Sequence, residues 1–225
     1  MLSNSKVDQL GDRLRVAASV SEKKDEADLR LLYVHRLSFG TAYRSVIRQI
    51  KERLHLEPSG RMKSNGSIIE KLRRESLRLS QVQDIAGCRL LVADMLEQDE
   101  IVDSLRGTFS AADVMDRRET PSHGYRAVHV IVPIEGKRVE IQVRTHLQHT
   151  WAQLSEAIAA RVGPSIKYGG GSTALRVRLD GIAEVIRQVE TMERAGEDVE
   201  DIKSKLVGQL VSFAPLLVGL TKDQP

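Results

Sequence analysis

The sequence has little of what a secreted or membrane-bound protein needs. The 225-residue chain has one cysteine, Cys88, so no disulfide can form within it. Its longest apolar-rich stretch, residues 206–220, is interrupted by polar residues and a proline and is too short to span a bilayer. No basic segment followed by an apolar run opens the chain, so no signal peptide is expected. We therefore expect a cytoplasmic protein that does not enter membranes.

Charge of one sign is also scarce, because 34 Lys and Arg residues nearly balance 31 Asp and Glu residues. The resulting net charge of +3 is compatible with phosphate-bearing ligands but identifies none. Aromatic residues make up only 4% of the chain, while hydrophobic residues make up 41%, enough for a sizeable core. The length allows one full domain with helical extensions.

Hydrophobic periodicity predicts an α+β protein. Apolar stripes with helical spacing predict helices over residues 25–55, 66–79, 95–105, 145–162, 173–194 and 199–219. Shorter apolar or alternating runs predict strands over residues 88–93, 112–117, 126–134 and 138–144, the last two joined by a hairpin turn at 134–137. This order of elements indicates an α+β core with helical additions at both ends.

A polar face on the last predicted strand is the strongest chemical signal in the chain. Residues 138–144 alternate polar and apolar, so Glu140, Gln142 and Arg144 share one face. The hairpin would place His129 on the neighbouring strand. A ladder of cross-strand ion pairs would explain this pattern. Alternatively, Glu140 could hold Mg²⁺ or activate a hydroxyl nucleophile.

Cationic residues gather around the start of the second predicted helix. Arg61 and Lys63 precede it, where the first backbone N–H groups of a helix point outward. Lys71 falls on roughly the same helix face as Ser67, and Arg73 follows. A helix start flanked by cations suits a polyphosphate. A solvated basic face is the alternative.

Three further residues complete a candidate site. Asp84 lies where a helix gives way to a buried strand, and its carboxylate suits Mg²⁺; a turn aspartate is the alternative. Gly124 permits a tight turn that exposes the Tyr125 ring for stacking on a base, and His129 could contact phosphates or transfer a proton. An ordinary strand with a core tyrosine is the alternative. Together, the cations, carboxylates, aromatic ring and histidine match a metal-assisted phosphoryl or nucleotidyl transfer site.

Four motifs follow one another between residues 61 and 145, and in this order they resemble the synthetase domain of RelA/SpoT proteins. The motifs are Arg61-x-Lys63-x-x-x-Ser67-x-x-x-Lys71, Gln83-Asp84-Ile85-Ala86-Gly87-x-Arg89, Gly124-Tyr125-Arg126-x-x-His129 and Glu140-Ile141-Gln142-Val143-Arg144-Thr145. The helices on either side resemble those of the small, single-domain alarmone synthetases. The resemblance implies a mixed β-sheet of about five strands flanked by helices, related to nucleotidyltransferases. It divides the chain into an N-terminal helical extension (1–60), a synthetase core (61–163) and C-terminal helices (172–221).

The resemblance also implies an activity and roles for individual residues. Such enzymes transfer the β,γ-pyrophosphate of ATP to the 3′-hydroxyl of GDP or GTP, giving (p)ppGpp and AMP. Asp84 and Glu140 would hold Mg²⁺, with Glu140 near the attacking hydroxyl, and Tyr125 would stack on the acceptor base. His129, Gln142 and Arg144 would contact the acceptor. ATP would be bound by Arg61, Lys63, Ser67, Lys71 and Arg73. Long members of the family carry a hydrolase domain with a His-Asp pair, which is absent here, so we expect synthesis without hydrolysis.

The chain departs from the family just before Gly124. Members that use guanine nucleotides usually have Asp-Tyr and then Pro-Lys in this stretch, and the Tyr and Lys are absent from residues 116–124. Losing this lysine removes an expected phosphate contact beside the acceptor. The family has a toxic subgroup with the same motifs, which pyrophosphorylates the 3′-CCA end of tRNA, blocks translation and is neutralised by an antitoxin; some members serve in phage defence. Here the surface cations Arg44, Arg48, Arg117 and Arg118 would contact the tRNA backbone.

Two expectations stay open beside these. The chain could be a non-catalytic, nucleotide-binding regulator, although its two intact carboxylates argue against this. The apolar stripes of the terminal helices could form a homo-oligomer or receive an antitoxin.

Overall fold

The computed structural model describes residues 3–19 and 25–219. Contacts between Cα atoms divide the chain into two compact units. The first comprises Met1–Leu90, Leu105–Asp113 and Val130–Gln142, and the second comprises Leu91–Ser104, Val114–His129 and Val143–Pro225. The chain passes repeatedly between the units, so this division does not follow sequence order. The division into 1–60, 61–163 and 172–221 stays a prediction, and residues 220 and 221 lie outside the described part.

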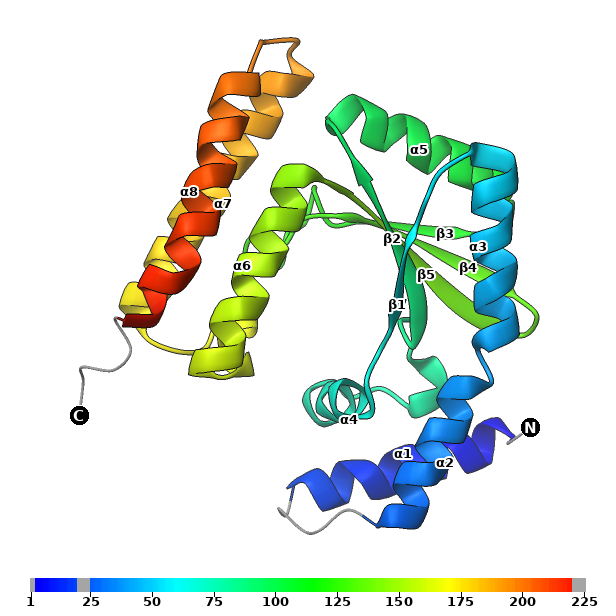
Figure 1. Ribbon diagram of the computed structural model, residues 1–225. Coiled ribbons are helices and arrows are strands. Elements are labelled where there is room, and N and C mark those ends of the chain that lie inside the picture. Colours follow the sequence, from blue (N-terminus) through cyan, green and yellow to red (C-terminus); the bar gives the residue numbers. More distant parts are fainter. Residues whose placement is uncertain (1–2, 20–24, 220–225) are drawn as a thin grey trace. The chain divides into compact units, whose positions relative to one another are not determined.

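Five strands form one sheet in the order β1-β2-β5-β4-β3, as expected of a mixed sheet flanked by helices (Figure 1). The strands are β1 (Ser59–Met62), β2 (Ala86–Val92), β3 (Asp113–Asp116), β4 (Val128–Ile134) and β5 (Lys137–Thr145). β1 pairs antiparallel with β2, which places Arg61 opposite Gly87. The sequence did not predict β1, because it is four residues long and mostly exposed.

The predicted hairpin is confirmed. Glu135 and Gly136 connect β4 to β5 and both have positive φ, 51° and 69°. Such a two-residue turn matches the right-handed twist of the strands that it joins. As predicted, His129 and Glu140 therefore lie on neighbouring strands of the sheet.

The first unit contains helices α1 (Asn4–Ser19), α2 (Glu26–Leu37), α3 (Gly40–Leu54) and α4 (Asn65–Arg74). The expectation of one helix over residues 25–55 is wrong, because the chain breaks between α2 and α3. The Ser38 hydroxyl caps the end of α2 by donating to the carbonyl of His35 (2.6 Å), and Phe39 is buried. α1 packs against α2 and α4 through an apolar core that includes Leu10, Leu14 and Leu32.

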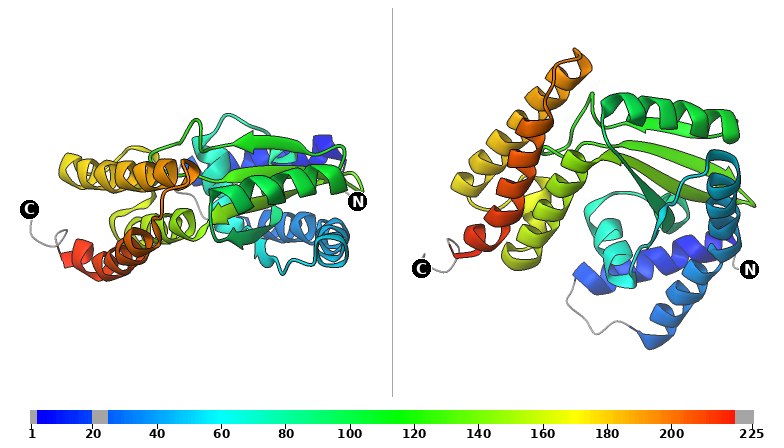
Figure 2. Two further views of the ribbon diagram at one scale, coloured as in Figure 1. Left: turned by 90° about the horizontal axis from the view of Figure 1, so that it is seen from above. Right: turned by 45° about the horizontal axis from the view of Figure 1, so that its top comes forward.

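The second unit contains α6 (His146–Val162), α7 (Thr173–Arg194) and α8 (Glu200–Gly219), which run from yellow-green to red in Figure 2. These helices match the predicted ones within a residue at each end. α5 (Met95–Thr108) is three residues longer than predicted, and a short 3-10 helix, η2 (Pro164–Tyr168), occupies the glycine-rich segment before α7. Trp151, Leu154, Leu179 and Ile186 belong to their common core. Among the helices of the described residues, none is both long and apolar enough to cross a membrane.

Candidate active site

Two hydrogen bonds fix the short connection between β1 and α4. The Lys63 backbone N–H donates to the carbonyl of Ile85 (3.0 Å), which ties the end of β1 to the entry of β2. The Ser64 hydroxyl then caps α4 by accepting from the Ser67 N–H (3.1 Å). α4 buries an apolar face made of Ile68, Ile69 and Leu72, and Lys71 is half-buried at the edge of this face.

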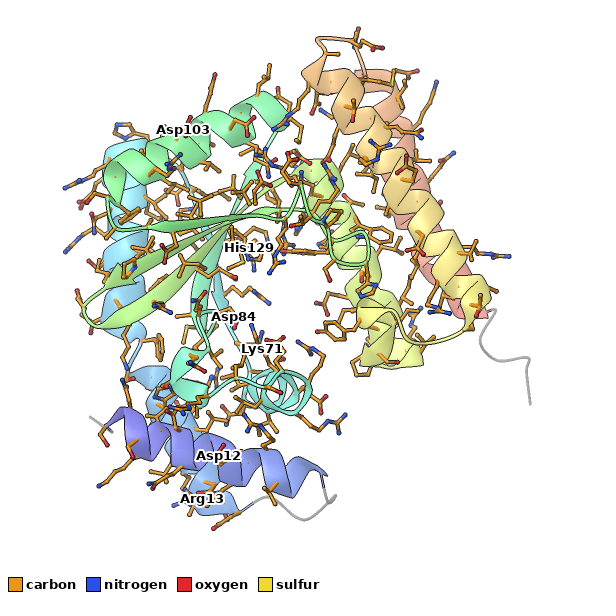
Figure 3. The ribbon with its side chains drawn as sticks, turned by 180° about the vertical axis from the view of Figure 1, so that it is seen from behind. Asp12, Arg13, Lys71, Asp84, Asp103 and His129 are labelled. Carbon is orange, nitrogen blue, oxygen red and sulfur yellow. The ribbon has the colours of Figure 1, made fainter. Side chains whose placement is uncertain are left out.

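The Asp84 carboxylate lies between the side chains of Lys63 and Lys71. It accepts hydrogen bonds from the ammonium groups of Lys63 (2.7 Å) and Lys71 (3.1 Å), and Lys71 and Asp84 are labelled in Figure 3. All three side chains are at least half-buried, and that of Asp84 is 11% exposed. Burial alone would raise the pKa of Asp84, but the two lysine charges and their hydrogen bonds lower it to about 2. The carboxylate is therefore ionised at neutral pH.

Glu140 forms a second carboxylate centre on β5. It is 6% exposed, and its Oε2 accepts from Gln142 Nε2 (2.5 Å) and pairs with Arg61 Nη1 (3.3 Å). The period-two spacing predicted for residues 140 and 142 is thus realised as a direct contact. Burial, followed by the negative charge of Glu140, raises the pKa of the neighbouring Cys88 thiol to about 12, so the thiol is protonated at neutral pH.

Gly87 allows the backbone of β2 to come close to Glu140. A Cβ atom at position 87 would overlap the carbonyl oxygen of Glu140 and lie 3.3 Å from its Cβ. A side chain at this position would push β2 and β5 apart. Asp84 lies just before β2 and Glu140 lies on β5, so the two carboxylates would be displaced as well. The glycine is therefore required by packing, since its φ is not in the left-handed region.

Two other residues assigned to ATP lie outside these contacts. Ser67 is exposed and its hydroxyl accepts from the Ser64 hydroxyl (2.9 Å). Arg73 is half-exposed and pairs with Glu70 (3.6 Å). The first unit thus brings four cationic or amide side chains onto the two carboxylates and leaves these two residues at the surface.

In the second unit, Tyr125 is held at the end of a tight turn. Its backbone N–H donates to the carbonyl of Ser122 (3.0 Å), and Gly124 between them has a φ of 77°. A Cβ at Gly124 would overlap Ala183 and the Trp151 ring. Both the positive φ and the close packing require glycine here, which confirms the predicted tight turn.

Tyr125, His129 and Arg144 form one hydrogen-bonded group. The Tyr125 hydroxyl lies 2.8 Å from His129 Nε2 and accepts from Arg144 Nη2 (2.6 Å). The Arg144 guanidinium also lies over the Tyr125 ring, 4.9 Å from its centroid. A cation therefore covers one face of the half-buried ring, and the His129 ring meets the Tyr125 ring in a T-shaped contact, with 5.8 Å between the centroids.

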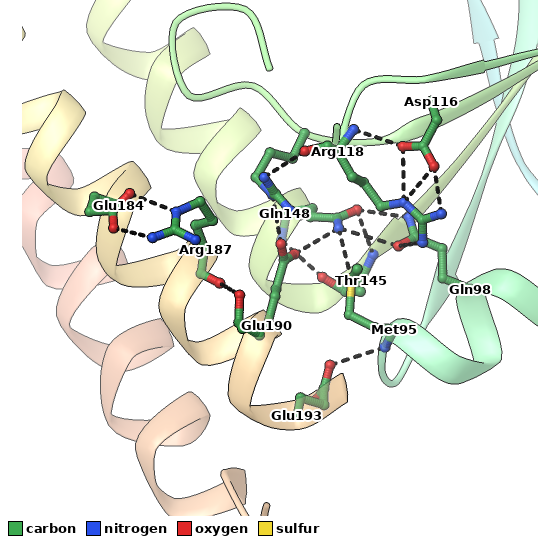
Figure 4. A network of polar contacts seen from close by, with 12 residues as sticks. Met95, Gln98, Asp116, Arg118, Thr145, Gln148, Glu184, Arg187, Glu190 and Glu193 are labelled. Atoms are coloured by element: carbon green, nitrogen blue, oxygen red, sulfur yellow. Dashed lines mark hydrogen bonds and ion pairs between the residues drawn. The ribbon is translucent and has the colours of Figure 1, made fainter. Parts of the chain in front are cut away.

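A buried polar network supports the segment that leads to Tyr125 (Figure 4). Glu190 on α7 accepts from Arg126 Nε (2.6 Å) and from Gln148 Nε2 (2.7 Å). Arg126 in turn donates to the carbonyl of Arg118 (2.8 Å). Gln148 also completes a capping box with Thr145 at the start of α6. The network ties the segment around Arg118 to the C-terminal helices.

Arg118 was expected to be a surface cation, and this expectation is wrong. It is 8% exposed, and its guanidinium pairs with Asp116 (2.6 Å) and Asp99 (2.6 Å). Arg117 is half-exposed and donates to the sulfur of Met115 (3.3 Å). Elsewhere, Arg44 and Arg48 on α3 are exposed, as expected of surface cations.

Sequence reasoning missed three of these supporting residues. The signals for Ser64 and Gln148 were present, because serine caps helices and Thr145-x-x-Gln148 has capping-box spacing. No local signal marks Glu190, which is 64 residues away from its partner Arg126.

The donor set fits Mg²⁺ in part. Magnesium prefers hard oxygen ligands and usually keeps water or phosphate in its shell, so two carboxylates suffice when a phosphate ligand completes the site. Among residues 3–19 and 25–219, no group of three or more His, Cys, Asp and Glu side chains could hold a metal alone. Asp84 and Glu140, both ionisable oxygen donors, are therefore suited to a metal that arrives with its nucleotide.

Known proteins resemble this chain in sequence and fold. The model of the region found in RelA/SpoT proteins matches residues 60–162. A GTP pyrophosphokinase of Bacillus subtilis is 28% identical over 172 residues, which cover 69% of this chain and 75% of that protein. An uncharacterized protein of Mycobacterium tuberculosis is 42% identical over 115 residues, 49% of this chain. The aligned part is 42% of that protein's length.

A solved structure agrees with the sequence comparison. The small alarmone synthetase 1 of B. subtilis, crystallised with its product pppGpp, has a TM-score of 0.54 at 23% identity, covering 76% of this chain and 96% of that one. The fold is thus that of the small alarmone synthetases. Residues 60–162 match the model of the region found in RelA/SpoT proteins, in agreement with the resemblance that the four motifs indicated.

Proposed function

We propose that this chain is an ATP-dependent pyrophosphotransferase, similar to GTP diphosphokinases. Two carboxylates carry the proposal, and both lie in the segment that matches the RelA/SpoT model. Asp84 is held by Lys63 and Lys71, and Glu140 is held by Arg61 and Gln142. Phosphoryl transfer needs little covalent chemistry from a protein and depends on positioned cations and metal ligands. A regulator that only binds nucleotides would not need two carboxylates at these positions.

The donor is ATP, bound by Arg61, Lys63, Ser67, Lys71 and Arg73. Without nucleotide, the Lys63 and Lys71 ammonium groups neutralise Asp84. A triphosphate would compete for these two cations and so free the Asp84 carboxylate. Binding of ATP and of its metal would thereby be coupled through one exchange of ion pairs.

Mg²⁺, held by Asp84 and Glu140, would neutralise charge that develops on the phosphates. The 3′-hydroxyl oxygen of the acceptor forms a bond to the β-phosphorus, and the bond from that phosphorus to the α,β-bridging oxygen breaks. AMP leaves with that oxygen, and the hydroxyl proton passes to Glu140. Gln142 orients this carboxylate by its hydrogen bond of 2.5 Å.

The acceptor is a guanine nucleotide, GDP or GTP, giving (p)ppGpp. Tyr125 stacks on the base with the face opposite Arg144, while Arg144 and His129 supply positive or polar contacts. Stacking of a base on an aromatic ring is worth about 1–3 kcal/mol. We also propose that the chain synthesises its product without hydrolysing it, because it has no adjacent His-Asp pair.

A tRNA 3′ end is the second candidate acceptor. It is favoured by the absence of Tyr and Lys from residues 116–124 and by the exposed cations Arg44 and Arg48. Arg117 can contribute to such a surface, whereas the buried Arg118 cannot without breaking its ion pairs. Phosphate contacts make tRNA binding steeply dependent on salt, unlike the binding of a single nucleotide.

The acceptor is identified by following label from ATP marked in its γ-phosphate. The protein receives Mg²⁺ and GDP, GTP or deacylated tRNA in separate reactions. Label in a guanosine product supports the first proposal, and label at the tRNA 3′ end supports the second. ATP binding without transfer to any of the three would contradict both. A further incubation with (p)ppGpp should yield no release of pyrophosphate if hydrolysis is absent.

We propose that the terminal helices contact a second copy of this chain. Val177 and Val185 lie eight residues apart on α7, and both are exposed (64% and 43%). Light scattering should give the mass of an oligomer, which Val177→Glu should lower. A monomer would contradict the proposal and leave an antitoxin as the occupant to test.

A further inference from the structure

A cavity of about 290 Å³ lies within the first unit, and none of its lining residues is assigned to ATP, Mg²⁺ or the acceptor. It is lined by the start of α1, the end of α2, the 3-10 helix η1 (Leu79–Gln81) and the turn between β4 and β5. Polar lining residues include Asn4, His35, Ser80, Lys137 and Arg138. The cavity thus brings together side chains from four segments that are distant in the sequence.

His35 carries the clearest sign of a missing partner. Its side chain is buried (7% exposed), and its Nε2 atom has no hydrogen-bond partner in the described part of the chain. The ring packs edge-on against Phe39, with 5.4 Å between the centroids. Burial, followed by the positive charge of Lys137, lowers the pKa of His35 to about 4, so the imidazole is neutral at pH 7. Buried polar atoms nearly always have a partner, so this nitrogen is suited to donate to a bound group.

Two cations at the start of β5, Lys137 and Arg138, line the same cavity. The Lys137 ammonium lies 4.6 Å from the centre of the Phe39 ring, and burial lowers its pKa. Within residues 3–19 and 25–219, neither Lys137 nor Arg138 forms an ion pair with a carboxylate. Lys137 is half-buried and Arg138 is exposed, and two such cations without a carboxylate partner attract an anion.

The start of α1 adds a third favourable element. α1 is 16 residues long and begins at Asn4, which lines the cavity. The first backbone N–H groups of such a helix carry partial positive charge. The opposing acids are few: Glu135 lines the cavity, and the Asp8 carboxylate is engaged by the Ser80 N–H (2.9 Å).

We propose that this cavity binds a small phosphate-bearing anion through His35, Lys137, Arg138 and the N-terminus of α1. A phosphate has several acceptor oxygens and up to two negative charges, which match a neutral histidine donor and two cations. The volume lies just below the usual range of pockets for drug-sized ligands, about 300–1,000 Å³. It therefore suits inorganic phosphate or a compact phosphate monoester rather than an extended nucleotide.

Side-chain NMR of the full-length protein, with ¹⁵N-labelled histidine, tests the proposal at the site itself. Inorganic phosphate and glycerol phosphate are titrated in separate arms at constant ionic strength, with sodium chloride as the matched salt. We expect a saturable shift of the His35 nitrogens, and the arm with tighter binding identifies the source of the phosphate. No shift, or the same shift with chloride, would overturn the proposal.

Variants separate this cavity from the site proposed for ATP. Lys137→Gln removes one hydrogen bond to a charged group and should weaken phosphate binding at His35 about tenfold. Arg48→Gln removes an exposed cation on α3 and should leave this binding unchanged. Lys71→Gln should also leave the His35 response intact, because Lys71 does not line the cavity. A His35 response that survives Lys137→Gln but is lost in Lys71→Gln would assign the phosphate to the ATP site and overturn the inference. Circular dichroism verifies that each variant folds.

Discussion

Removal of the Glu190 carboxylate should destabilise the protein more than any surface change. Glu190 and Arg126 form an ion pair of 2.6 Å whose side chains are 2% and 10% exposed. In Glu190→Ala, the Arg126 guanidinium would stay buried and lose its counter-charge. Breaking such a pair costs about 3–5 kcal/mol. For a chain of this length, that loss corresponds to a fall in melting temperature of roughly 6–20 °C.

Two companion variants sharpen this prediction. Glu190→Gln keeps the hydrogen-bonding shape and should cost less than the alanine variant, because the amide oxygen can still accept from Gln148. Replacing both partners, Arg126→Met with Glu190→Met, should recover much of the loss, since no unpaired charge remains buried. Thermal unfolding followed by circular dichroism measures all three.

A matched surface pair serves as the control. Arg30 and Glu26 are 80% and 82% exposed and 3.3 Å apart, so Glu26→Gln should leave the melting temperature nearly unchanged. If Glu190→Ala behaves like Glu26→Gln, the buried network does not hold the segment before Tyr125, and the reasoning is refuted.

Three other changes test the site. Asp84→Asn should remove about 2 kcal/mol of stability that the wild type has above pH 4 and loses as pH falls through the folded pKa of about 2; equal acid unfolding of both proteins would contradict the assigned ion pairs. Gly87→Ala should cost about 1–3 kcal/mol in chemical denaturation, whereas Gly107→Ala, where a Cβ meets nothing within 4 Å, should not destabilise. Tyr125→Ala should raise the KM for the acceptor about 5- to 150-fold with little change for ATP, as expected for lost base stacking; equal effects on both substrates would make Tyr125 structural.

Periodicity predicted most of the secondary structure. α6, α7 and α8 repeat apolar residues with helical spacing over 17 to 22 residues, and their bounds were predicted within a residue. The prediction of one helix over 25–55 was wrong because the apolar stripe continues across the break at Ser38. Gly40 is the local sequence feature that marks this break. β1 could not be predicted from four mostly exposed residues, because its conformation depends on pairing with β2.

In the candidate site, likewise, local contacts could be predicted from the sequence and contacts between distant residues could not. The spacing of Glu140 and Gln142 was enough to predict that they share one strand face, and the structure adds the hydrogen bond between them. The contacts of Asp84 with Lys63 and Lys71 join residues that are 21 and 13 positions apart in the sequence, and no local pattern predicted them. Arg118 was predicted to be a surface cation because one of its ion-pair partners, Asp99, lies on another element, α5.

The most direct test of pyrophosphate transfer is the ratio of AMP formed to pyrophosphorylated acceptor formed, measured by chromatography with Mg²⁺, ATP and the acceptor that takes the label. Transfer of the β,γ-pyrophosphate predicts one AMP for each product, and loss of both in Glu140→Gln, whose volume and hydrogen bonding are nearly those of the wild type. ADP as the co-product, or full activity of Glu140→Gln, would contradict the proposed reaction and the role of its central carboxylate.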